Sequence, residues 1–259
     1  MSRPFLSVII LEVLSVTLAV AGATMLTALI PGLPGYSVRG PSQSFVLVLL
    51  EMLLLLLLVG SFRWWSLAGF TPPVRWHRLR LYWLPVALLA VPFAGGVKMP
   101  PLSAIAILLV GYLATAVYEE GLWRGVMVGL LRPSGVWKSV LITSLLFGLA
   151  HLGNSALRGL SPLIAAQAFG AAVQGIGLAA LRLRTNTIWP LIVIHFLHDL
   201  FLQMSALPIP LVEVPIDTIM AIYGIILLRH HRRHLAEDPD SPHRRGLAQG
   251  SRAAADPSP

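Results

Sequence analysis

Two adjacent carboxylates and an arginine stand inside an apolar stretch of the chain, at Glu119, Glu120 and Arg124. An ionisable side chain at bilayer depth costs several kcal/mol unless it is paired or hydrated, so such residues are candidates for function. On a helix, Glu120 and Arg124 share a face and can form an ion pair, while Glu119 points about 100° away. The spacing predicts one carboxylate held by the arginine and a second one directed toward another partner.

Two later apolar segments carry histidines at helical spacing. His151 follows Phe147 by four residues and Asp199 follows His195 by four, so each pair shares one side of a helix. Removing a carboxylate from bulk water raises its proton affinity and makes it a better general base near neutral pH. Imidazoles and a further carboxylate can position a water molecule, a metal ion or the oxyanion of a tetrahedral intermediate. These residues therefore predict a buried Glu/His/His/Asp site for chemistry on a water molecule.

The composition is that of an integral membrane protein. Hydrophobic residues make up 56% of the 259 positions and charged residues 12%, with a mean hydropathy of +0.77. The absence of cysteine excludes disulfides, thiolate catalysis and Cys-based zinc or iron–sulfur sites. Any metal must therefore bind through histidine and carboxylate side chains.

Hydropathy predicts an all-α, polytopic membrane bundle of about eight transmembrane helices of roughly 20 residues each. The site would lie between the fourth, fifth and seventh helices. The fourth apolar stretch is longer than one span requires, which fits a single long tilted helix with a polar middle. The predicted spans are Phe5–Ile30, Ser44–Gly60, Leu81–Val97, Leu102–Leu131, Val136–Leu152, Leu163–Leu181, Ile188–Met204 and Pro210–Leu228.

Counting residues along the helices tests whether the polar groups can meet. The segment Arg132–Gly135 predicts a tight turn between the fourth and fifth helices. Glu119 lies 15 residues before Ser134 and His151 lies 17 residues after it, so their depths differ by about 3 Å. His195 is only nine residues beyond Asn186, where the seventh helix is expected to begin, and so lies nearer the cytoplasm by this count. Helix tilt or a deep turn could close that gap.

The chain divides into four predicted regions. Residues 1–101 hold N-terminal transmembrane helices, residues 102–204 the membrane core with the candidate site, residues 205–228 the last transmembrane helix, and residues 229–259 a disordered basic cytoplasmic tail. Within the first region, residues 61–83 mix arginines with tryptophans, which favours an interfacial anchor at headgroup level over a substrate-docking surface.

The distribution of basic residues predicts the orientation, because loops rich in Lys and Arg stay in the cytoplasm. With both termini cytoplasmic, only Arg39, Lys98 and Arg158 lie outside. Topology then accounts for the net charge of +8, and the sequence carries no nucleic-acid motif. We expect a multi-pass protein of a bacterial plasma membrane, with the lipid bilayer as a partner. The basic residues placed inside are Arg3, Arg63, Arg75, Arg78, Arg80, Arg132, Lys138, Arg182, Arg184 and those of the tail from Arg229.

Three motifs in this order resemble a known family. Glu-Glu-x-x-x-Arg, Phe-x-x-x-His and His-x-x-x-Asp/Asn are similar to those of the CAAX-protease and bacteriocin-processing (CPBP) family of intramembrane endopeptidases. This family is also called the type II CAAX prenyl endopeptidase or abortive-infection family. The resemblance covers residues 102–204. Each motif is short, and the specificity lies in finding all three in order on separate predicted helices.

The resemblance implies a role for each motif residue. Glu119 would activate the attacking water, Glu120 and Arg124 would orient it, and His151 with His195 would complete the site. Asp199 belongs to the same set and stands where the eukaryotic prenyl endopeptidases have Asn.

The resemblance also implies a metalloprotease with a divalent metal, zinc by the usual assumption, although a metal-free glutamate-activated water has been proposed for the family too. The metal ligands would be Glu119, His151, His195 and Asp199, a donor set that suits an open catalytic zinc site. The implied activity is cleavage of a peptide or protein substrate near the cytoplasmic membrane face. Prenylated CAAX proteins, peptide or bacteriocin precursors and membrane-anchored regulators all remain open as substrates.

Other functions are compatible with single features of the chain. Buried Glu, His and Asp residues also serve proton-coupled transporters, and histidines can hold haem in membrane cytochromes. The transporter hypothesis leaves the order of the motifs unexplained, and the haem hypothesis gives the glutamate pair no role. His198 lies outside the motifs and is expected to pack away from His195. Glu213 and Asp217, four apart in the last span, could line the same cavity.

Overall fold

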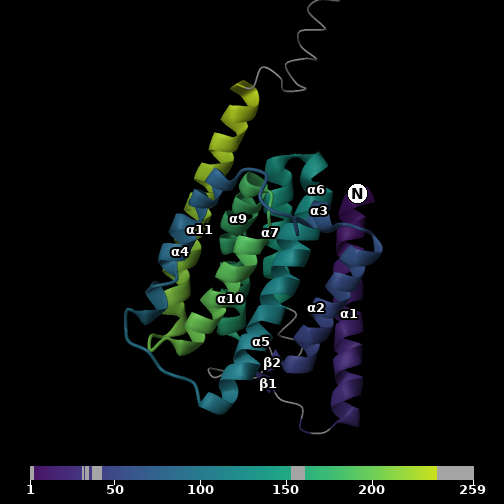
Figure 1. Cartoon of the computed structure of the whole chain (residues 1–259), viewed down its shortest axis with the longest axis vertical. Coiled ribbons are helices and arrows are strands. Elements are labelled where there is room, and N and C mark those ends of the chain that lie inside the picture. The colour runs from purple at the N-terminus through teal and green to yellow at the C-terminus, as the bar shows by residue number, and fades with distance from the viewer. Residues whose placement is uncertain (1–2, 31, 33–34, 37–42, 153–160, 238–259) are drawn as a thin grey trace, which may run out of the picture.

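The computed structural model describes residues 3–30, 32, 35–36, 43–152 and 161–237, and these residues form a bundle of helices (Figure 1). The expected all-α class is confirmed, apart from two short strands that pair antiparallel, β1 (Gly35–Tyr36) and β2 (Gln43–Ser44). The principal helices are α1 (Arg3–Leu29), α2 (Phe45–Ser61), α5 (Leu102–Glu119), α7 (Val136–Leu152), α9 (Pro162–Thr185), α10 (Trp189–Met204) and α11 (Ile209–Glu237).

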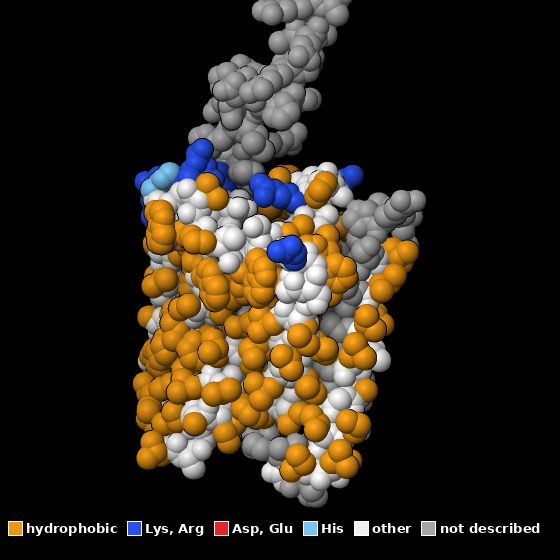
Figure 2. All heavy atoms as spheres, turned by 45° about the vertical axis from the view of Figure 1, so that its right-hand side comes forward, with side chains coloured by type: hydrophobic (Ala, Val, Ile, Leu, Met, Phe, Trp, Pro, Cys, Tyr) orange, Lys and Arg blue, Asp and Glu red, His pale blue; other side chains and the backbone are white. Residues whose placement is uncertain are grey.

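Apolar helices support an integral membrane protein. In the described part of the chain, three helical stretches are long and apolar enough to cross a membrane: Leu102–Ser134, Pro162–Thr185 and Ile209–His230. Helices α2, α7 and α10 are shorter and also apolar. Figure 2 shows hydrophobic side chains covering most of the visible flank below a cap of basic residues, as expected for a surface that faces lipid.

The predicted span Leu81–Val97 differs from the structure, and the count of about eight spans stays a prediction. Residues 81–97 do not form one helix but a 3-10 helix (Trp76–Tyr82), the short helix α4 (Trp83–Leu88) and a second 3-10 turn (Val91–Phe93). Pro92 cannot continue an α-helical hydrogen-bond ladder, and Gly96 adopts a left-handed conformation with φ 101°. Apolar composition alone therefore suggested a span where the backbone is broken.

The C-terminal helix also differs in length from its prediction. Helix α11 runs to Glu237, past the predicted end at Leu228 and into the segment expected to be a disordered tail. Residues 229–237, which continue the helix, contain neither proline nor glycine. Residues 238–259 of the predicted tail lie outside the described residues.

The fourth predicted span is one continuous helical stretch whose centre is not α-helical. Helix α5 passes directly into a π-helix (Glu120–Met127), which continues as α6 (Val128–Leu131). A 3-10 turn at Arg132–Ser134 and Gly135, with φ 112°, then reverse the chain, as the sequence predicted. A π-helix is rare and frequently accompanies a functional site, and this one carries both Glu120 and Arg124.

Three glycines bring another segment against the π-helix. Gly121, Gly125 and Gly129 are four residues apart and form a glycine face. The short helix α3 (Trp65–Ala68) lies against Gly125 and Gly129, while Leu55 and Phe70 lie against Gly121. A Cβ at Gly125 would stand 2.8 Å from the carbonyl oxygen of Ala68, closer than real Cβ atoms approach. Without side chains at Gly125 and Gly129, the α3 backbone can contact the π-helix and α6 directly.

The remaining helices pack around α9 and α5. Helix α9 lies between α7 and α11, while α5 contacts α2 and α10, and α1 packs on the far side of α2 (Figure 1). The largest buried apolar cluster joins α9, α10 and α11 through residues such as Leu181, Leu191 and Ile216. A second cluster joins α2 to the π-helix and α7 and includes Leu55, Trp123 and Phe147. The candidate residues thus stand on elements held together by apolar packing.

Candidate active site

The buried centre of the site is an ion pair on the π-helix. Nη1 of Arg124 donates to Oε1 of Glu120 over 3.0 Å, and both side chains are buried, with Glu120 at 0% exposure. A charge-assisted bond of this kind offsets part of the cost of burying both groups. The expected contact between these two residues is therefore present, although the backbone between them is π-helical.

An aromatic ring holds the other side of the arginine. The guanidinium carbon of Arg124 lies 4.0 Å from the centroid of the Phe147 ring, a cation–π contact. The buried Nη2 of Arg124 has no hydrogen-bond partner among the described residues. Trp123 packs edge-on against the same ring, with centroids 5.6 Å apart. Phe147 therefore joins α7 to the π-helix through both polar and apolar contacts.

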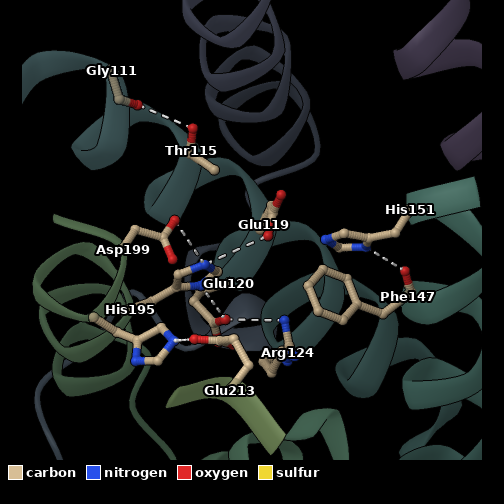
Figure 3. A network of polar contacts seen from close by, with 11 residues as sticks. Gly111, Thr115, Glu119, Glu120, Arg124, Phe147, His151, His195, Asp199 and Glu213 are labelled. Carbon is tan, nitrogen blue, oxygen red and sulfur yellow. Dashed lines mark hydrogen bonds and ion pairs between the residues drawn. The ribbon is translucent and has the colours of Figure 1, made fainter. Parts of the chain in front are cut away.

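His195 on α10 joins the carboxylates of three segments. Its Nδ1 donates to Oε1 of Glu120 at 2.8 Å, and its Nε2 lies 3.6 Å from Oε2 of Glu119 and 3.5 Å from Oδ2 of Asp199 (Figure 3). The bond to Glu120 fixes the rotation of the imidazole and leaves Nε2 facing Glu119 and Asp199. The structure thus brings four sequence-predicted residues, Glu119, Glu120, His195 and Asp199, into one cluster.

The depth of His195 follows from how α10 begins. The backbone N–H of Ile188 donates to the carbonyl of Gly69 at 2.9 Å, next to α3 and therefore close to the level of Gly125. Five residues of π-helix separate Glu120 from Gly125, and seven residues separate His195 from Ile188. The 2.8 Å contact between the Glu120 and His195 side chains shows that the two reach the same depth. The difference in depth between His195 and the glutamates, expected from counting residues from Asn186, is therefore absent from the structure.

Burial separates the two glutamates into different environments. The Glu119 side chain keeps 21% of its surface exposed and Asp199 keeps 23%, whereas Glu120 is sealed. Glu119 is therefore the glutamate that a water molecule or a substrate can reach. Glu120 is placed instead to hold Arg124 and His195.

His151 is oriented from within its own helix. Its Nδ1 donates to the carbonyl oxygen of Phe147 at 2.9 Å, and its ring packs edge-on against that of Phe147, with centroids 4.6 Å apart. The carbonyl can only accept, so Nδ1 carries the proton and Nε2 of the neutral ring is an acceptor. In Figure 3 the free side of the ring points toward Glu119. His151 thus faces the exposed glutamate from the side opposite His195.

The donor types, but not their arrangement, suit a metal. Both histidines direct Nδ1 to an acceptor, as zinc-ligating imidazoles usually do with one ring nitrogen, but Nε2 of His195 already faces the carboxylates of Glu119 and Asp199. A catalytic zinc takes three protein ligands. Among the described residues, however, no three His, Asp or Glu side chains form a group that could hold a metal ion. We therefore derive no chemical step through a metal.

The other polar residues of the last two helices form a separate pair. Nε2 of His198 lies 3.0 Å from Oε1 of Glu213 on α11, and Asp217 is buried against Gly170 on α9. His198 and His195 both line a cavity between α4, α9, α10 and α11, together with residues such as Gln174. His198 therefore pairs with Glu213 rather than with the carboxylate cluster, although it lines the same cavity as His195.

Three features of the site were not foreseen in the sequence. The contact between Arg124 and Phe147 and the π-helix follow from packing and have no local signature. The packing of α3 did have one, because Gly121, Gly125 and Gly129 repeat every four residues, a spacing typical of close helix contacts in membranes.

Comparison with known proteins gives one match. Residues 101–201 match the family model described as Type II CAAX prenyl endopeptidase Rce1-like. Comparisons with curated proteins and with solved structures found no match. The matched segment begins just before α5 and ends within α10, so it contains all six sequence-predicted site residues.

Proposed function

Since residues 101–201 form a domain of the Rce1-like type II CAAX prenyl endopeptidase family, we propose that the protein is an intramembrane endopeptidase whose Glu119 activates the attacking water. Its substrate is a peptide or protein associated with the membrane. The observation that carries this proposal is the contrast between the two neighbouring glutamates. Glu119 is partly exposed beside two imidazoles, while Glu120 is fully buried and holds one of them in place.

The proposed reaction is hydrolysis of one peptide bond. The Glu119 carboxylate takes a proton from water, and the water oxygen bonds to the carbonyl carbon as the carbonyl electron pair moves to oxygen. The tetrahedral intermediate then collapses and the C–N bond breaks. The nitrogen takes the proton held by Glu119, which releases an amine and a carboxyl product. Glu119 returns to its starting state, so no other reactant is needed.

The imidazoles and Asp199 position the reacting groups in this scheme. Nε2 of His151 accepts a hydrogen bond from the second O–H of the water, without taking its proton, and so aims a water lone pair at the substrate carbonyl. His195 stands on the other side of Glu119, fixed by Glu120, and Asp199 limits the rotation of its ring. Arg124 acts through Glu120 and is a positioning residue. Zinc, implied by the resemblance, remains a separate proposal that these steps do not use.

The proposed cleavage position is near the cytoplasmic face. Arginines and lysine gather at one end of the bundle (Figure 2), and the positive-inside rule assigns that end to the cytoplasm. Both termini would then be cytoplasmic.

Peptide cleavage by the purified protein tests the proposal. Wild type, Glu119→Gln and His151→Ala are placed in lipid nanodiscs with a library of apolar peptides, prenylated and unprenylated, in water enriched in oxygen-18. We expect wild type to produce new carboxyl ends that carry the label. Glu119→Gln should cleave at least about 100-fold more slowly, since general-base catalysis contributes about 10²–10⁴-fold.

A matched control distinguishes the loss of Glu119 from the loss of any carboxylate in an apolar helix. Glu51 lies on the apolar helix α2, and Glu51→Gln should cleave like wild type. Full activity in Glu119→Gln, or products without the label, would contradict water activation by Glu119. If the wild-type protein cleaved no peptide of the library but carried out proton-driven transport, the transporter hypothesis would be favoured instead.

A further inference from the structure

A cluster of arginines at the basic end has no acidic counterpart nearby. Arg78, Arg132, Arg182 and Arg184, here called the arginine cluster, come from three segments far apart in the sequence. The neighbouring described stretches 61–83, 129–138 and 182–189 contain no Asp or Glu. Figure 2 shows the basic side chains gathered at one end of the apolar surface, with no acidic side chain among them on this face.

Neutral oxygens at the end of α9 arrange these arginines in two pairs, Arg132 with Arg182 and Arg78 with Arg184. Oδ1 of Asn186 accepts from Nη1 of Arg182 at 3.2 Å and from Nη1 of Arg132 at 3.4 Å. Nη1 of Arg78 donates to the carbonyl oxygen of Arg184 at 2.9 Å. These bonds satisfy helix-end acceptors, and the partial negative charge of a helix C-terminus favours cations there. They do not neutralise four full positive charges.

The cluster keeps unused donors. Nε of Arg182 and Nε of Arg184 are buried and have no hydrogen-bond partner among the described residues, and Arg132 is exposed. Each guanidinium offers five N–H groups in a planar fork that matches a phosphate group. Burial and the nearby Arg75 lower the pKa of Arg78, as expected where positive charge is crowded. An anion bound here would relieve that repulsion.

The surrounding aromatic residues indicate where such an anion would come from. Trp65, Trp76 and Trp83 are exposed on the segment that also carries Arg78. Exposed tryptophans concentrate at the level of lipid headgroups. We propose that the arginine cluster binds the phosphate headgroup of an anionic phospholipid, with Arg78 and Arg132 as its accessible contacts.

Lipid retention measured by native mass spectrometry tests this proposal. Full-length protein is taken from nanodiscs of phosphatidylcholine with rising fractions of phosphatidylglycerol, and retained lipids are counted for wild type and for Arg78→Gln with Arg132→Gln. We expect wild type to retain phosphatidylglycerol preferentially, and each arginine removed to weaken binding about fivefold. The control variants are Lys98→Gln, in the loop after the 3-10 turn Val91–Phe93, and Lys138→Gln on α7. Both residues are exposed, and both variants should behave like wild type.

Three results would overturn the proposal. Equal retention of both lipids by wild type would exclude a headgroup site. An equal loss in Lys138→Gln and in the arginine variant would indicate diffuse surface charge rather than a built site. Displacement of the lipid by millimolar inorganic phosphate, with equal affinity for free phosphate, would indicate a phosphate site instead. Because Arg182 holds α3 through a 3.0 Å bond to the carbonyl of Leu67, it is left unchanged so that the variants fold.

Discussion

Nδ1 of His195 lies 2.8 Å from Oε1 of Glu120, the same oxygen that accepts the hydrogen bond of Arg124. A single buried carboxylate oxygen therefore joins α10 to the π-helix. Glu119, its neighbour in the chain, is the more exposed of the two and faces the opposite nitrogen of the same imidazole. Two consecutive residues of one type thus have different tasks because one is sealed and the other is accessible.

Breaking the Glu120–Arg124 pair should destabilise the protein strongly. Arg124→Met leaves the Glu120 charge buried beside His195 alone, and such losses cost about 3–5 kcal/mol. Adding Glu120→Gln to Arg124→Met should restore part of the stability, because no unpaired charge then remains. Thermal unfolding in detergent measures both variants. Strictly additive losses would show that the two side chains are not coupled.

Removing the Phe147 ring should lower both stability and peptide turnover by more than the loss of apolar volume alone would. Phe147→Leu loses the cation–π contact with Arg124, worth about 0.5–2 kcal/mol, and the ring that packs against His151. We expect slower cleavage as well as lower stability, measured by peptide turnover and thermal unfolding. Phe201, which packs on Phe93 away from the site, provides the matched change Phe201→Leu. Phe201→Leu should lose stability without a comparable loss in turnover. An equal loss of turnover in Phe147→Leu and Phe201→Leu would contradict a specific role of Phe147 in the site.

Side chains added to the glycine face should displace α3. Alanine at Gly125 or Gly129 places a Cβ 2.8 Å from the backbone oxygen of Ala68 or Leu67, and overpacking of this kind costs about 1–3 kcal/mol. Gly60→Ala is a control, because the nearest atom to its Cβ is a Trp65 ring carbon at 3.8 Å. Unfolding temperatures of the three variants give the comparison. A Gly125→Ala protein as stable as Gly60→Ala would mean that α3 does not pack as described.

Zinc binding remains a prediction of the family resemblance and can be measured directly. If the prediction is right, zinc copurifies with wild type, and a chelator removes both the zinc and the peptide cleavage. Adding zinc then restores both. His195→Ala should then hold less metal, by elemental mass spectrometry, than His198→Ala, whose ring pairs with Glu213. A metal-free protein that cleaves at the wild-type rate would refute the zinc prediction and leave water activation to Glu119 alone.

Local spacing in the sequence was sufficient for several features. Apolar runs predicted helices at α1, α2, α5, α7, α9, α10 and α11, since a helical period and a lack of charge are properties of the segment itself. Spacing of four residues predicted, for the same reason, the pair of Glu120 with Arg124 and the placing of His195 and Asp199 on one side of a helix. The broken region around α4 escaped this reasoning because hydropathy does not register backbone breaks at Pro92 and Gly96.

The sequence by itself determined the membrane character of the chain, the order of its helices and the residue types available for chemistry. Only the tertiary structure decided that Glu120 is fully buried while Glu119 is partly exposed, and that His195 lies at the same depth as both. Those outcomes depend on contacts between distant segments, such as Ile188 with Gly69 and α3 with the glycine face. Helical periodicity sets which side of a helix a residue occupies, whereas packing between helices sets its depth and its access to water.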